Sequence, residues 1–206
     1  MKYKFLDKFQ VVGIMQKNSK DTHMLKKLII TISILCSCLS YGSSNYQIDL
    51  ILFTQPHSAS DDSDLDLDSP FIPISRNAIS LKNDSSKSLK PFHLLSPSKS
   101  ALRDEYYLLN RKHQYQMLGQ YSWIQPRSNQ GTVALPMINK NGWQMQGTVK
   151  VIQNTFFDLD SELQLSPPSN PQSSFTVVQK QRLKENVVYY LDHAQLGMLI
   201  KIHRVG

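Results

Sequence analysis

Two neighbouring residues near the C-terminal end, Asp192 and His193, could cooperate in acid–base chemistry. A carboxylate can orient an imidazole during proton transfer. Sequence neighbours on a turn rarely reach that geometry, because an Asp in a turn more often binds its own backbone two residues further on. No Ser or Cys occupies a nucleophile-elbow motif that would complete such a site. We therefore interpret Asp192 as a turn-forming residue in preference to a catalytic one.

Three further carboxylates, Asp158, Asp160 and Glu162, follow one another at steps of two. In an extended strand this spacing places them on one face, where a hydrolase could use a pair of them. The apolar residues that alternate with them favour a strand with one solvated face instead. The sequence also lacks a phosphate-binding loop, a dinucleotide-binding fingerprint, a zincin helix and a histidine cluster. We expect no catalytic residue, no metal and no cofactor.

An acidic run occupies residues 61–68, where Asp alternates with Ser and Leu. It resembles the oxygen-rich start of an EF-hand calcium loop, but it lacks the glycine of the turn and the bidentate glutamate at the twelfth position. We interpret the run as part of a solvated, flexible Ser/Asp-rich linker over residues 56–100, since too little apolar surface is present to offset the entropy of ordering.

A group of aromatic and amide side chains could bind sugars, because rings stack on C–H faces while amides bind hydroxyl groups. Trp123, Gln125 and Tyr190 are the members that we single out, and packing in the core is the competing interpretation for the tryptophan. The other members are Tyr121, Trp143, Gln144, Gln146 and Tyr189.

The elements that would position these residues follow from the hydrophobic period. A helix is expected from a cap at Ser98 or Ser100 to Gly119, because apolar residues recur there at steps of three and four. Strands, which alternate apolar and polar residues, are expected at 46–53, 120–125, 131–138, 143–151, 157–165, 175–178, 187–191 and 196–203. Residues 139–142, Asn-Lys-Asn-Gly, are expected to form a hairpin turn between two of these strands. The clearest strands each have one solvated face, which favours an antiparallel sheet. The fold class is therefore α+β: a mostly antiparallel sheet of about seven or eight strands, with one main helix packed on one face.

The N-terminal segment, residues 1–42, looks like an export signal. Residues 1–27 carry seven lysines against two aspartates, and residues 28–41 carry no charge. Met24 is an alternative start, because the segment before it is unusually long. Cys38 closes a sequence that resembles a lipobox, so a lipid-anchored protein is the alternative to a plain signal peptide and a periplasmic protein. Residues 43–206 carry 16 basic and 14 acidic residues, which argues against nucleic-acid binding.

Five short motifs appear in an order that resembles the CsiV family of periplasmic peptidoglycan-binding proteins, named for cell-shape integrity. They begin with residues 46–53 and end with residues 190–197, which resemble the family's Y-L-D-H-P-x-F-G. Between them lie a W-x-Q-P match at residues 123–126, the strand residues 157–160, and residues 182–184. Two departures are Gln181, where the family has the first of two arginines, and Ala194, where it has proline.

The resemblance implies an exported, non-catalytic protein that binds peptidoglycan and supports cell-wall synthesis or integrity, with a wall synthase or its activator as a further partner. Trp123 would stack on the ligand, Gln125 would bind its amides, and Arg182 would pair with a stem-peptide carboxylate. Residues 190, 192 and 193 of the last motif are the remaining candidates. A cell-wall hydrolase and a lipoprotein adaptor that contacts other envelope proteins remain the alternatives.

Overall fold

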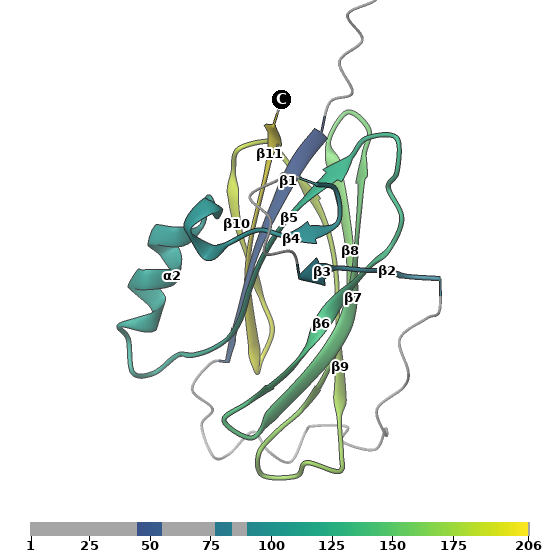
Figure 1. Ribbon diagram of the computed structural model, residues 1–206. Helices are drawn as coiled ribbons and strands as arrows, with labels where there is room; N and C mark the ends of the chain where they lie inside the picture. The colour runs from purple at the N-terminus through teal and green to yellow at the C-terminus, as the bar shows by residue number, and fades with distance from the viewer. Residues whose placement is uncertain (1–44, 55–76, 84–89, 206) are drawn as a thin grey trace, which may run out of the picture. The chain divides into compact units, whose positions relative to one another are not determined.

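The computed structural model describes residues 45–54, 77–83 and 90–205 (Figure 1). The expected export segment with Met24 and Cys38 lies outside the described residues, and so does the acidic run at 61–68. In chain order the elements are β1 (Asn45–Thr54), β2 (Ile79–Ser80), β3 (Lys82–Asn83), β4 (His93–Leu94), η2 (Pro97–Lys99), α2 (Arg103–Asn110), β5 (Gln116–Pro126), β6 (Val133–Lys140), β7 (Trp143–Gln153), β8 (Phe157–Ser166), β9 (Phe175–Leu183), β10 (Val188–Asp192) and β11 (Leu196–Val205).

These strands form two sheets, and the expectation of a single sheet with seven or eight strands is wrong. The first sheet has the order β10-β11-β1-β5-β4-β3, and the second has the order β2-β6-β7-β8-β9. All strand pairs are antiparallel except β2 with β6 and β3 with β4, so the mostly antiparallel character is confirmed. The physical reason for two layers is the length of the helix: eight residues cannot cover the apolar face of a long sheet, so the two sheets cover each other.

The main core lies between the two sheets. Tyr46, with Ile48, Leu50 and Leu52, points from β1 into this core, as the alternation predicted. The Tyr46 ring meets Phe157 edge to face with centroids 5.3 Å apart, and its hydroxyl donates a hydrogen bond to the Val151 carbonyl at 3.3 Å. Burial raises the pKa of Tyr46 above its usual value, because an ionised phenol would lose its hydration there. The apolar faces of the two sheets thus stabilise each other.

The helix is shorter than the period predicted. It ends at Asn110, and residues 116–126 form β5, which pairs with β1 along its whole length. Gly119 therefore lies inside β5, next to a bulge opposite Leu52 and Phe53, and does not end the helix. A Cβ at Gly119 would lie 2.8 Å from Ile138 Cδ1 and 2.9 Å from the Tyr121 ring, so a larger residue here would make these two side chains shift. Pairing with the central strand outweighs the local helical period.

Helix α2 packs on one face of the six-stranded sheet, as expected (Figure 1). Tyr106 and Leu109 contact a second cluster of buried apolar residues on the side of that sheet away from the main core. The cluster consists of Ile51, Phe53, Leu102 and Met117.

Residues 77–83 and 90–100, which are the described parts of the serine-rich segment, pack against the sheets. Leu81 is buried, and Phe92 and Leu94 pack against the main core. The Phe92 N–H donates to the Ile124 carbonyl at 2.9 Å, and the Leu95 N–H donates to the Ser122 carbonyl at 2.8 Å. The segment therefore extends the six-stranded sheet beyond β5.

The tight hairpin between β6 and β7 is confirmed. Lys140 pairs with Trp143, which leaves Asn141 and Gly142 as a two-residue turn with positive φ angles of 52° and 82°. These angles are those of a type I′ turn, whose twist matches the twist of the flanking strands. The hairpin fixes the register of β7, and β7 in turn positions β8 and β9.

Candidate functional site

Trp123 and Gln125 lie in the interior, so the expected role of stacking on a ligand does not fit the structure. The tryptophan is fully buried, and its Nε1 lies 3.4 Å from the Gln125 Oε1. The Gln125 amide donates to the Val151 carbonyl of the other sheet at 3.4 Å. The two side chains thus hold the sheets together, in agreement with the competing interpretation that the tryptophan packs in the core.

Tyr190, Asp192 and His193 meet at the turn between β10 and β11. The half-exposed Tyr190 donates its hydroxyl to Asp192 Oδ1 at 2.7 Å and stacks on Phe53 with centroids 6.2 Å apart. The His193 ring stacks on Phe175, also at 6.2 Å. These contacts assign the motif to holding the turn, since the aspartate binds a phenol and the imidazole lies flat on a ring.

Two backbone N–H groups donate hydrogen bonds within the turn. The His193 N–H donates to the Leu196 carbonyl at 3.1 Å, and the Gln195 N–H donates to His193 Nδ1 at 3.4 Å. The Asp192 carbonyl accepts a hydrogen bond from the Gln179 amide of β9 at 3.1 Å, which ties the turn to the second sheet.

Arg182 lies apart from the other candidates, on the outer face of the five-stranded sheet. Its Nε is 3.1 Å from Asp158 Oδ1, and its guanidinium lies 5.6 Å from the centroid of the Phe156 ring. The side chain is 68% exposed. The residues singled out from the sequence therefore occupy three separate places, and only Arg182 belongs to an open, charged surface.

The outer face around Arg182 carries cations on both sides of a row of acids. The three acids lie on the same face of β8, as predicted, and Asp160 pairs across the strands with Lys150 of β7 and Lys180 of β9. The Lys180 ammonium is 3.3 Å from Asp160 Oδ2. We call this surface the β7–β8–β9 face, and its charged residues are Lys150, Asp158, Asp160, Glu162, Lys180 and Arg182. Three cations and three acids leave it without net charge.

A shallow hollow of about 490 Å³ opens on the β7–β8–β9 face. Its lining combines cationic and acidic side chains with a substantial apolar surface: Lys150, Ile152, Asp158, Leu159, Asp160, Lys180, Gln181 and Arg182. Such a lining suits a ligand with charged groups of both signs. Across the described ranges, no three His, Cys, Asp or Glu side chains are placed to hold a metal ion.

Sequence reasoning missed the two lysines of this hollow, Lys150 and Lys180. Both fall on the polar side of an alternating strand, which was visible in the sequence. Their position beside Asp160 depends on the register between β7, β8 and β9, and no single-strand pattern gives that register.

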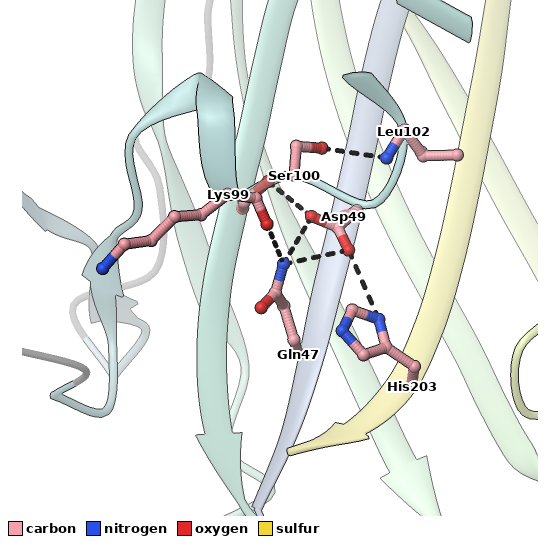
Figure 2. Close-up of polar contacts among 7 residues, drawn as sticks. Gln47, Asp49, Lys99, Ser100, Leu102 and His203 are labelled. Carbon is pink, nitrogen blue, oxygen red and sulfur yellow. Dashed lines mark hydrogen bonds and ion pairs between the residues drawn. The ribbon is translucent and has the colours of Figure 1, made fainter. Parts of the chain in front are cut away.

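Sequence reasoning also missed a buried carboxylate, Asp49, on the other sheet (Figure 2). Asp49 lies on central strand β1 and is fully buried. The Ser122 hydroxyl donates to Asp49 Oδ1 at 2.6 Å, and the Gln47 amide lies 2.9 and 3.2 Å from the two carboxylate oxygens. His203 Nδ1 is 3.5 Å from Oδ2, within ion-pair distance when the imidazole is protonated. A charged residue in an otherwise apolar strand was the available signal.

The same cluster anchors the segment before the helix. The Gln47 amide also donates to the Lys99 carbonyl of η2 at 2.9 Å, and the Leu102 N–H donates to Ser100 Oγ at 3.2 Å (Figure 2). Asp49 and its donors therefore connect β1, β5 and β11 with the chain that enters α2, which is a structural role.

Comparison with known proteins identifies the family. The profile of the family described as "Peptidoglycan-binding protein, CsiV" matches residues 24–205, which is most of the chain. No significant match is found among curated proteins or among solved structures. Within the described ranges, no helix has the length and apolar character needed to span a bilayer. The chain belongs to the CsiV family of peptidoglycan-binding proteins.

Proposed function

We propose that this protein is an exported, non-catalytic component of the bacterial envelope that binds peptidoglycan and supports cell-wall synthesis. The observation that carries the proposal is the family match over residues 24–205. The lysine-rich start followed by an uncharged apolar stretch supports export to the periplasm.

The surface that we assign to peptidoglycan is the β7–β8–β9 face. It is the open side of the five-stranded sheet, and it combines a hollow with charged side chains of both signs. A polymer with charged side branches can bind such a shallow surface through several weak contacts along its length. The other candidates are buried, or they hold a turn.

Co-sedimentation with purified sacculi tests the proposal. The protein, produced from the full chain and purified from the envelope fraction, should pellet with sacculi at low ionic strength and remain in solution without them. A protein that stays in the supernatant in both cases contradicts peptidoglycan binding.

The same incubation tests the absence of catalysis. We expect no release of soluble muropeptides, because the Asp192 carboxylate binds the Tyr190 hydroxyl and His193 stacks on an aromatic ring. Release that disappears in Asp192→Asn would favour the cell-wall hydrolase instead.

Two further parts of the proposal concern the subcellular location of the protein and its protein partner. We propose that the protein is periplasmic and assists a wall synthase or its activator. Fractionation of Cys38→Ala tests the alternative of a lipoprotein adaptor: if this change releases the protein from membranes, Cys38 carries a lipid. An unchanged distribution supports the soluble periplasmic form.

A further inference from the structure

We propose that the β7–β8–β9 face binds the stem peptide of peptidoglycan and not its glycan strand. This inference rests on the proposed function and assigns the ligand class of the same face. Peptidoglycan has two chemically different parts: glycan chains that are rich in hydroxyl and acetamido groups, and peptides that carry free carboxylates and, in many cases, an ammonium group.

The aromatic residues argue against a sugar site. Stacking on a sugar needs a flat ring whose face is open to solvent. Trp123 is fully buried, and the half-buried Trp143 packs edge to face on Phe175. Phe156 is the exposed ring closest in sequence to the hollow, and the Arg182 guanidinium lies over it. The β7–β8–β9 face therefore offers charge in place of a stacking surface.

The cations of the face are arranged to receive carboxylates. Lys150 makes no ion pair in the part of the chain that the structure describes, although it stands beside Asp160 in the register. Arg182 contacts Asp158 through its Nε, and this contact leaves the two terminal nitrogens of the guanidinium for a ligand. Lys150 and Arg182 lie on the two strands that flank β8, opposite Asp160 and Asp158 respectively. Two strand spacings and an offset of two residues separate their backbones by roughly 12 Å. This separation suits two carboxylates of one extended peptide.

The acids of the face are arranged to receive an ammonium group. Glu162 stands between Thr148 and Val178 in the register, with no cation directly opposite on either neighbouring strand. It lies on the same face of β8 as Asp160, one pleat repeat further along the strand. A peptide that carries both carboxylates and an ammonium group could thus meet both kinds of partner along β8.

The experiment is an NMR titration of the full protein with two separate probes. One probe is the tripeptide L-Ala-γ-D-Glu-meso-diaminopimelate, and the other is glycan from which an amidase has removed the peptides. We expect the tripeptide to shift amide signals of β7, β8 and β9, and the bare glycan to leave those signals in place.

Matched variants sharpen the titration. Lys150→Gln should weaken tripeptide binding about tenfold, because it replaces the cation with a neutral polar side chain that is only one atom shorter. Lys82→Gln, an exposed lysine of β3, makes the same change in net charge and should leave the affinity unchanged. Asp158→Asn should strengthen binding several-fold, because it frees the Arg182 guanidinium from its partner. A purely structural ion pair would give no such gain.

The outcomes separate this inference from the proposed function. If the protein pellets with sacculi while only the bare glycan shifts its signals, or if Lys150→Gln and Lys82→Gln behave alike, the stem-peptide inference is wrong and peptidoglycan binding stands. If the protein binds neither sacculi nor either probe, the proposed function fails as well.

Discussion

An aspartate in the middle of a strand is buried in the six-stranded sheet, whereas two such aspartates are partly exposed in the five-stranded sheet. Asp49 of β1 is fully buried, and neutral side chains from its own strand and from β5 donate to it. Asp158 and Asp160 of β8 are partly exposed, and each faces a cation across the strands. The outer side of the first sheet is covered by η2 and α2, whereas the outer side of the second is open.

This difference separates the residues that stabilise the fold from those that we assign to ligand binding. Covering a carboxylate removes its hydration, so the fold must replace every lost contact with a fixed donor. An exposed carboxylate beside a cation keeps water and can exchange its partner for a ligand at little cost. We therefore expect substitutions on the first sheet to change stability, and substitutions on the second to change binding.

The largest effect is expected for Asp49→Ala. It removes the acceptor of the Gln47 amide and the Ser122 hydroxyl and leaves these two donors buried, so the free energy of unfolding should fall by roughly 3–5 kcal/mol. Asp160→Ala is the matched control on the open sheet and should cost about 1 kcal/mol or less. Urea denaturation followed by circular dichroism measures both. Equal losses would remove the distinction between the two faces.

The next effect concerns the glutamines. Gln47→Ala should lower the free energy of unfolding by about 1–3 kcal/mol, because the Asp49 carboxylate and the Lys99 carbonyl both lose a buried donor. The control is Gln146→Ala, which removes a partly buried hydrogen bond to Gln164 at 2.9 Å and should cost about 1 kcal/mol or less. If thermal or urea unfolding shows the reverse order, the anchoring role of Gln47 is wrong.

A third effect tests the core that both sheets share. Burial raises the pKa of Tyr46 and Tyr121, so the folded state holds their protons at a pH where the unfolded chain releases them. The contribution of these two tyrosines to the free energy of unfolding should be constant below pH 10. Above pH 10 it should fall by about 1.4 kcal/mol for each tyrosine and each pH unit.

Tyr46→Phe should halve the alkaline slope of the unfolding free energy, since one buried phenol is gone. Tyr107→Phe, at an exposed position of α2, serves as the control and should keep the slope of the unchanged protein. A slope that is identical in all three proteins would show that burial of Tyr46 is not its cause.

The smallest effect on stability is expected for Arg182→Gln. Its ion pair with Asp158 is exposed, and such pairs contribute about 0–1 kcal/mol. Urea unfolding should therefore place this variant within about 1 kcal/mol of the unchanged protein. A larger loss would give the arginine a structural role and weaken its assignment to binding.

Local patterns were enough to predict most long strands and one hairpin. The alternation in β7 and β8 gave the core-facing side correctly, because one face of each strand is polar, whereas β1 is buried on both faces. The turn at Asn141 and Gly142 followed from residues that tolerate positive φ angles. The division of the strands into two sheets could not be predicted, because local sequence patterns do not show which apolar face packs against which.

The candidate site was harder to predict than the fold. The three acids of β8 were recognised as a solvated strand face, and Arg182 was named through the family resemblance. The neighbours of these residues on β7, β8 and β9 depend on register, which the sequence pattern does not give. Trp123 was predicted to stack on a ligand. A tryptophan two residues from an amide side chain has the same sequence pattern whether it lies on the surface or in the core. Only burial by the second sheet separates the two.

One pair of variants tests most directly whether the β7–β8–β9 face binds peptidoglycan. Arg182→Gln and Arg204→Gln each remove one exposed arginine with an acidic partner at 3.1 and 3.2 Å, respectively, and only the first lies on that face. In co-sedimentation with sacculi, we predict about a tenfold loss of affinity for Arg182→Gln and an unchanged affinity for Arg204→Gln. Equal affinities of the two variants for sacculi would contradict the account.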